Sequence, residues 1–184
     1  QFLKIKYQSN KSIMDKKPIT HFLTGAITGG ILILFSVILI ITDQMQNQKL
    51  GFVSFALMVL ALVYFIREFA KSKDNAVTFG ELFAFGFKAS AFATILLLAF
   101  QVIYNLAFPE MQDKMLEITR EKILEQNPQT PDEQIEMALS FTKKFFWPFV
   151  IGGTILSTLI MGAIGSLIGA AVTKKNPTTP FNHV

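Results

Sequence analysis

The stretch GAIGSLIGA, residues 162–170, places three glycines in nine residues, and a related stretch, TGAITGG, begins at Thr24. Glycine at this spacing suits two purposes. Free backbone N–H groups of a glycine-rich loop hold a phosphate, whereas small residues on a helix let a second helix approach closely. A phosphate-binding loop follows a strand and leaves its N–H groups free. Both stretches lie inside long apolar runs, where a helix would occupy those groups, so the sequence favours helix packing.

The small residues of these stretches recur at intervals of four, which places them in stripes along a helix face. One stripe lies on the first apolar run of the chain and two adjoining stripes lie on the last. We predict a helix-packing role for Gly25, Gly29, Gly162, Gly165, Ser166, Gly169 and Ala170. We expect the first and last runs to contact each other, or a second copy of the chain, through these stripes.

Uncharged polar residues also interrupt the apolar runs. Gln101 and Asn105 lie four residues apart in the third run, and Thr154 and Thr158 lie four apart in the fourth. Such residues usually make interhelical hydrogen bonds, which contribute about 0.6–2 kcal/mol each. The alternative is that these four residues line a pathway for a polar solute. Both interpretations stay open on the sequence alone.

Ionisable residues are absent from the middle of every apolar run. Asp43, Glu68, Glu81 and Lys88 all lie at the edges, whereas proton-coupled transporters and intramembrane proteases keep such groups deep in the bilayer. The chain has no cysteine and only two histidines, far apart in the sequence. We therefore expect no enzyme activity and no catalytic, metal-binding or cofactor-binding residue. We also expect no nucleic-acid partner.

The elements that carry these residues are long apolar segments. Only 16% of the 184 residues are charged and 51% are hydrophobic, whereas a soluble domain has about 25% charged residues. A bilayer core about 30 Å thick requires about 20 apolar helical residues. We predict an all-α integral membrane protein with a lipid-embedded domain over residues 18–175, and transmembrane helices at about 20–42, 50–67, 85–108 and 145–173.

Residues 110–144 predict a helical hairpin outside the bilayer, between the third and fourth spans. Asn127 and Pro128 divide it, and the second helix has a start signal in Thr130-Pro131-Asp132-Glu133, with Thr130 as the N-cap. A capping box, formed by Thr78 and Glu81, predicts where the helix of the third span begins.

The distribution of positive charge predicts the orientation. Four spans place both termini on one side, and the segments of that side carry eleven of the 17 Lys and Arg residues. Because positive residues favour the cytoplasm, we expect the cytoplasmic (inner) membrane, both termini inside and the hairpin outside. Residues 1–17 are then a basic cytoplasmic arm and residues 176–184 a disordered tail.

The order of these features is familiar. The opening MDKKPITHFLTGAITGGILILFSVILI, the block VTFGELFAFGFKASAFATILLLAFQVIYN and the glycine-rich last span before a basic tail are similar to one family. The chain resembles the domain of unknown function 4199 family, small multi-pass inner-membrane proteins typical of Bacteroidetes. The resemblance covers about residues 14–175 and implies a multi-pass membrane protein. It transfers no functional residue.

Three hypotheses for the function follow. We favour a non-enzymatic structural or accessory subunit that contacts the bilayer and a protein partner, or a second copy, through the glycine stripes or the outer hairpin. The alternative is a small uncoupled channel or transporter lined by Gln101, Asn105, Thr154 and Thr158. An enzyme acting on lipids through Glu117 or Glu121 is the least favoured, because no nucleophile and base accompany them. A polar cavity between the four helices would favour transport over the accessory role.

Overall fold

The computed structural model describes residues 19–45 and 47–176, which form six helices and no strand. The helices are α2 (His21–Ile41), α3 (Gln48–Ser72), α4 (Phe79–Ala107), α5 (Glu110–Gln126), α6 (Asp132–Lys144) and α7 (Phe146–Val172). Among the described residues, α2, α3, α4 and α7 are long and apolar enough to cross a membrane. This confirms the prediction of an all-helical chain with four apolar spans. The predicted N-terminal arm and residues 177–184 of the predicted tail lie outside the described residues.

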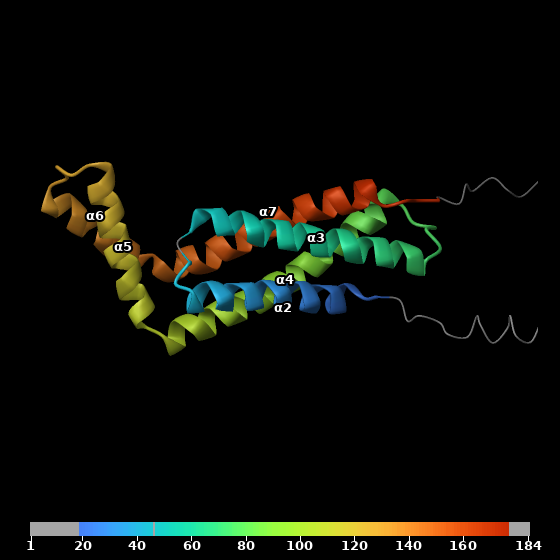
Figure 1. The fold of residues 1–184 in the computed structure, drawn as a ribbon, viewed down its shortest axis with the longest axis horizontal. Coiled ribbons are helices and arrows are strands. Elements are labelled where there is room, and N and C mark those ends of the chain that lie inside the picture. Colours follow the sequence, from blue (N-terminus) through green and yellow to red (C-terminus); the bar gives the residue numbers. More distant parts are fainter. Residues whose placement is uncertain (1–18, 46, 177–184) are drawn as a thin grey trace, which may run out of the picture.

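The four apolar helices form a bundle in which α4 occupies the central position. In Figure 1, α4 crosses the bundle diagonally, and it packs against α2, α3 and α7. The start of α2 and the end of α7 lie at one end of the bundle, while α5 and α6 lie at the other. We call these the termini end and the α5–α6 end. The described chain therefore begins and ends at the same end of the bundle, as expected for an even number of spanning helices.

The closest contact in the bundle is a reciprocal fit between α4 and α7. A Cβ atom on Gly86 of α4 would lie 2.6 Å from the Ser166 Oγ of α7, and a Cβ atom on Gly162 of α7 would overlap Ser90 of α4. Each serine therefore fills the notch left by a glycine of the other helix. Small residues permit this approach, and van der Waals packing then holds the helices together where the hydrophobic effect does not operate between them.

The stripe on α2 meets α4. A Cβ atom on Gly25 would lie 2.5 Å from the Ala89 carbonyl oxygen, and one on Gly29 would lie 3.3 Å from the Ala93 Cα. The prediction that the first and last spans meet through their stripes is therefore wrong. The central position of α4 explains the difference, because α4 offers its own small residues to both neighbours.

The two adjoining stripes of α7 divide between two partners. Gly162 and Ser166 face α4, whereas Gly165 and Gly169 face α3: a Cβ atom on Gly169 would lie 2.5 Å from the Ile66 Cδ1. Ala170 is fully buried. All of these small residues are buried against other helices of the same chain. None of the predicted stripes is therefore free to contact a second copy of the chain.

The helix ends differ from the predicted spans because a charge-free run measures the hydrocarbon thickness and not the helix length. The second helix continues past Arg67 to Ser72, and the third begins at Phe79. The predicted capping box is present: the Thr78 hydroxyl accepts from the Glu81 N–H at 3.2 Å, and Glu81 accepts from the Thr78 N–H at 2.8 Å.

The start of α6 does not follow the prediction. Pro131 occupies the N-cap position, and the Thr130 hydroxyl instead donates to the Asn127 carbonyl oxygen at 2.7 Å. A short polar side chain can bond to the preceding turn as readily as to the following helix. The prediction of Thr130 as the N-cap is therefore wrong.

The termini end is closed by the residues after α7. The Lys175 Nζ donates to the carbonyl oxygens of Ala170 and Thr173 at 2.7 and 3.0 Å, which satisfies carbonyl groups at the negative end of the helix dipole. The Asn176 N–H, at the start of the predicted disordered tail, donates to the Asn75 carbonyl oxygen at 2.7 Å. These contacts tie the end of α7 to the connection between α3 and α4.

Candidate functional site

Two cavities lie between the helices towards the α5–α6 end. The first, which we call the mouth cavity, has a volume of about 120 Å³ and is lined by residues of α4, α5, α7 and the end of α2. The second, which we call the bundle cavity, has a volume of about 180 Å³ and is lined by residues of α2, α3, α4 and α7. Gln101 lines both cavities. Because they share this residue, the two cavities are adjacent, and we refer to them together as the crevice.

The bundle cavity is lined by uncharged polar side chains from all four apolar helices: Ser36, Ser54, Gln101, Thr154, Ser157 and Thr158. Several of the hydroxyls donate to a carbonyl one turn earlier in their own helix. The Ser36 Oγ donates to the Leu32 carbonyl at 2.9 Å, and the Thr154 Oγ1 donates to the Val150 carbonyl at 2.7 Å. Their hydrogens are thereby used, but the oxygen lone pairs can still accept from a molecule in the cavity.

Gln101 is the least satisfied of these side chains. Its amide offers two hydrogens and one acceptor oxygen, and it makes no hydrogen bond to another of the described residues. Its amide atoms are not among the buried side-chain atoms that lack a partner, so a water molecule or a polar ligand in the crevice can reach them and bond to them. The position of Gln101 therefore favours a hydrated crevice.

Asn105 lies one turn further along α4, at the mouth cavity. Its side chain is only 5% exposed, and its Nδ2 donates to the Gln101 backbone carbonyl at 2.8 Å. Its Oδ1 has no hydrogen-bond partner in the part of the chain that the structure describes. This oxygen can therefore accept from a molecule in the mouth cavity.

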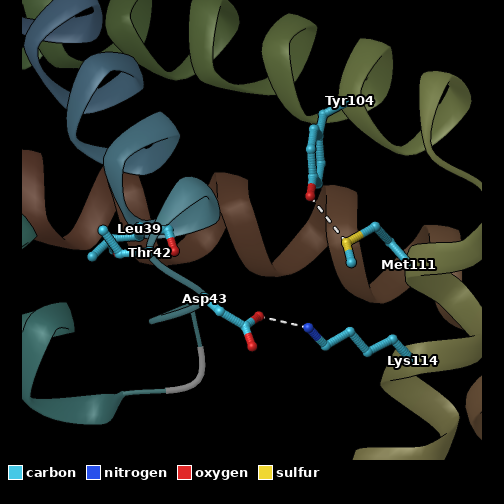
Figure 2. A network of polar contacts seen from close by, with 6 residues as sticks. All are labelled: Leu39, Thr42, Asp43, Tyr104, Met111 and Lys114. Carbon is cyan, nitrogen blue, oxygen red and sulfur yellow. Dashed lines mark hydrogen bonds and ion pairs between the residues drawn. The ribbon is translucent and has the colours of Figure 1, made fainter.

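The wall of the mouth cavity opposite the bundle is α5. Two contacts hold it, and Figure 2 shows both: the Lys114 Nζ lies 2.6 Å from the Asp43 Oδ1, and the Tyr104 hydroxyl donates to the Met111 sulfur at 3.0 Å. No residue of α5 is buried. The wall is therefore attached by a few exposed contacts rather than by a packed core.

The charge state of Lys114 in the ion pair at the mouth is defined. Asp43 has a left-handed backbone (φ 54°) just after α2, which directs the chain away from the helix. The hydrogen bond and the charge of Asp43 raise the pKa of Lys114 above its usual value, since both favour the ammonium form. Lys114 is therefore positively charged throughout the physiological range of pH.

The four residues of the predicted polar pathway all line the crevice. Asn105 lines the mouth cavity, Thr154 and Thr158 line the bundle cavity, and Gln101 lines both. Sequence reasoning missed Ser36 and Ser54. A usable signal existed, because each is a lone hydroxyl residue in an apolar stretch a few residues from the α5–α6 end of its helix.

The geometry of the described residues gives no support to a lipid-acting enzyme that uses Glu117 or Glu121. Glu117 and Glu121 lie on α5, and neither lines either cavity. Among residues 19–45 and 47–176, no three His, Asp or Glu side chains are grouped in a way that could hold a metal ion.

The fold and the crevice define the class of this protein: it is a multi-pass helical membrane protein with four apolar helices around a polar crevice. The sequence profile of the family described as "Protein of unknown function (DUF4199)" matches residues 23–175, and the chain belongs to this family. No curated protein and no solved structure matches the chain. The resemblance predicted from the glycine and hydropathy pattern is thereby confirmed.

Proposed function

We propose that this protein is a non-enzymatic, uncoupled channel or transporter that admits a small, net-neutral polar molecule through the crevice. The observation that carries the proposal is the meeting of polar side chains from four apolar helices around two cavities that share Gln101. Hydroxyl and amide groups replace the hydration of a polar solute without requiring a proton or an ion to be co-transported. This is the sequence-based alternative, and the crevice makes it preferable to a purely structural role.

The size and charge of the bundle cavity specify the solute. Every described residue that lines it is uncharged, so a solute with a net charge would lose its hydration with no opposite charge to replace it. An apolar cavity of about 150 Å³ accepts a benzene-sized molecule, so the bundle cavity, at about 180 Å³, admits a solute of about six heavy atoms or a short row of water molecules.

We further propose that the protein resides in the cytoplasmic (inner) membrane with the α5–α6 segment outside and both termini inside. The support is the excess of Lys and Arg, eleven of 17, in residues 1–21, 67–88 and 174–184, the segments that the sequence assigns to the side of the termini, because positively charged residues favour the cytoplasmic side. In this orientation the crevice opens to the exterior.

An accessory role is the second candidate function. Met137 and Phe141 lie one turn apart on α6, and they are 68% and 53% exposed. Exposed apolar residues on a segment that projects from the bundle are a suitable contact for a protein partner. This observation supports the α5–α6 segment, rather than the glycine stripes, as the surface of such a contact.

The transport proposal is tested by removing a single hydroxyl from the crevice. We expect Thr158→Val to slow the entry of lactamide, an uncharged solute of suitable size, into liposomes that contain the full-length protein. The loss should be about tenfold, since one hydrogen bond of about 1–1.5 kcal/mol is removed. Radiolabelled uptake measures this rate.

Thr94→Val is the matched control for this prediction. Thr94 lies on α4, is buried to nearly the same degree as Thr158 (4% against 6% exposed), and lines neither cavity. We expect Thr94→Val to transport at the wild-type rate. Equal rates in wild type, Thr158→Val and Thr94→Val would reject the pathway, as would a wild-type rate no higher than that of empty liposomes.

A further inference from the structure

We infer that the mouth cavity selects a zwitterion, a molecule or headgroup that carries one ammonium group and one acid group a few bonds apart. The inference rests on the proposed function, because it names the class of molecule that the crevice receives. It starts from the ion pair at the mouth: Asp43 and Lys114 both line the cavity, and the Asp43 Oδ1 lies 2.6 Å from the Lys114 Nζ.

The charges at the mouth sum to zero. Among the residues that the structure describes, Asp43 and Lys114 are the only Asp, Glu, Lys or Arg residues that line the mouth cavity. A solute with a net charge would bring a like charge close to one of them, and an uncharged solute could form hydrogen bonds to both but would bring no charge of its own to either. A zwitterion pairs its ammonium with Asp43 and its acid group with Lys114.

The existing pair is easily exchanged for a ligand. The Asp43 and Lys114 side chains are 81% and 47% exposed, and an exposed ion pair contributes little to stability. The two residues also belong to different elements, the connection after α2 and helix α5. A ligand can therefore separate them without breaking a packed core or distorting one rigid element.

Neutral polar groups lie beside the ion pair in the same cavity. The Tyr104 hydroxyl donates to the Met111 sulfur, which is a weak acceptor, so a ligand oxygen would be a better partner. Asn105 Oδ1 and the Gln101 amide have no other partner among the described residues. These groups can bind the uncharged atoms of the ligand once its two charges are paired.

The volume restricts the zwitterion. At about 120 Å³, the mouth cavity is slightly smaller than one that accepts benzene, so it holds about five or six heavy atoms. Two sources have this chemistry: a small free amino acid, which fits whole, or the phosphoethanolamine headgroup of a phospholipid, of which the ethanolamine and part of the phosphate enter while the rest of the lipid stays outside the cavity.

The first arm of the test compares alanine with lactamide. The two are constitutional isomers, and only alanine is a zwitterion, so size and composition are matched. Uptake is measured in phosphatidylglycerol liposomes, which supply no zwitterionic lipid. We expect alanine to half-saturate wild-type uptake at about tenfold lower concentration than lactamide, the effect of pairing its two charges with two exposed side chains of opposite charge.

Variants assign this preference to the ion pair. The double variant Asp43→Asn/Lys114→Gln should abolish the preference for alanine over lactamide. The exchanged variant Asp43→Lys/Lys114→Asp should restore the preference, which separates a folding defect from lost recognition. Arg120→Gln/Glu136→Gln is the matched control. It also removes an exposed ion pair, which joins α5 to α6, but neither of its residues lines the mouth cavity.

The second arm tests the lipid source. The full-length protein is incubated with equal amounts of phosphatidylethanolamine and phosphatidylglycerol, and native mass spectrometry measures which lipid it retains. Retention of phosphatidylethanolamine that is lost in Asp43→Asn/Lys114→Gln supports the inference with a lipid headgroup as the ligand. A preference for alanine over lactamide supports it with a free zwitterion.

The remaining outcomes overturn the inference in distinguishable ways. If alanine and lactamide half-saturate uptake at equal concentrations and no lipid is preferred, zwitterion selection is rejected and the proposed transport function stands. No uptake of either isomer and no retained lipid reject both the inference and the proposed function.

Discussion

Gly25→Ala is expected to destabilise the bundle, although alanine normally favours a helix. The added Cβ would lie 2.5 Å from the Ala89 carbonyl oxygen of α4, which is a backbone atom and cannot rotate away. Helix α2 must then move from α4, and overpacking of this kind lowers the free energy of unfolding by about 1–3 kcal/mol. Equilibrium unfolding of the protein in mixed micelles of mild detergent and SDS measures the change.

Gly30→Ala is the matched control on the same helix. A Cβ atom at Gly30 meets nothing within 4 Å, so only the intrinsic helix preference acts, and it favours alanine by up to about 1 kcal/mol. We therefore expect opposite signs from two identical substitutions five residues apart. Equal stabilities of Gly25→Ala and Gly30→Ala would show that α2 does not pack against α4 at Gly25.

Gln101→Met is expected to reduce lactamide entry more than any other single change in the crevice. Methionine keeps the unbranched shape and nearly the length of glutamine, but it cannot donate a hydrogen bond and accepts one only weakly. Because Gln101 lines both cavities, its amide is the polar group that the two cavities share. Loss of two hydrogen bonds to the solute predicts about a 100-fold slower rate in the liposome uptake assay.

Gln101→Asn provides the comparison for this prediction. Asparagine carries the same amide on a shorter side chain, so we expect it to retain most of the rate that Gln101→Met loses. If both variants transport as wild type does, the amide has no role in passage. If both are equally slow, the length of the side chain matters and the amide does not.

The number and kind of the apolar helices could be predicted from the sequence because they depend on local composition. An apolar, charge-free run of about 20 residues is typical of a transmembrane helix and rare in a soluble protein. The capping box at Thr78 depends only on atoms three residues apart. The prediction for Thr130 used the same local rule and failed, because the Asn127 carbonyl competes for its hydroxyl. Local signals are reliable where only one partner lies within reach.

The partners of the glycine stripes could not be predicted because the pairing of helices is not a local property. Small residues at Gly25 and Gly165 show that each helix approaches another closely, but every apolar helix here carries a candidate surface. The central position of α4 decides the pairing, and it emerges only when all four helices are assembled.

The candidate site was predictable in part for the same reason. Gln101 and Thr158 are conspicuous in apolar runs, so sequence reasoning finds them. The meeting of Asp43 with Lys114 is not visible in the sequence, because 71 residues separate them and both look like ordinary surface charges. The contact depends on how α5 leaves the end of α4.

The most direct test of the account asks whether water reaches the bundle cavity. The chain has no cysteine, so Thr158→Cys and Thr94→Cys each introduce a unique thiol at sites of nearly equal burial. The rate of modification by a small hydrophilic methanethiosulfonate is measured in lipid nanodiscs, which expose both membrane faces. A thiol reacts as the thiolate, which water favours and an apolar setting suppresses. We predict that Thr158→Cys reacts much faster than Thr94→Cys; equally slow reaction at both positions would contradict a hydrated polar crevice.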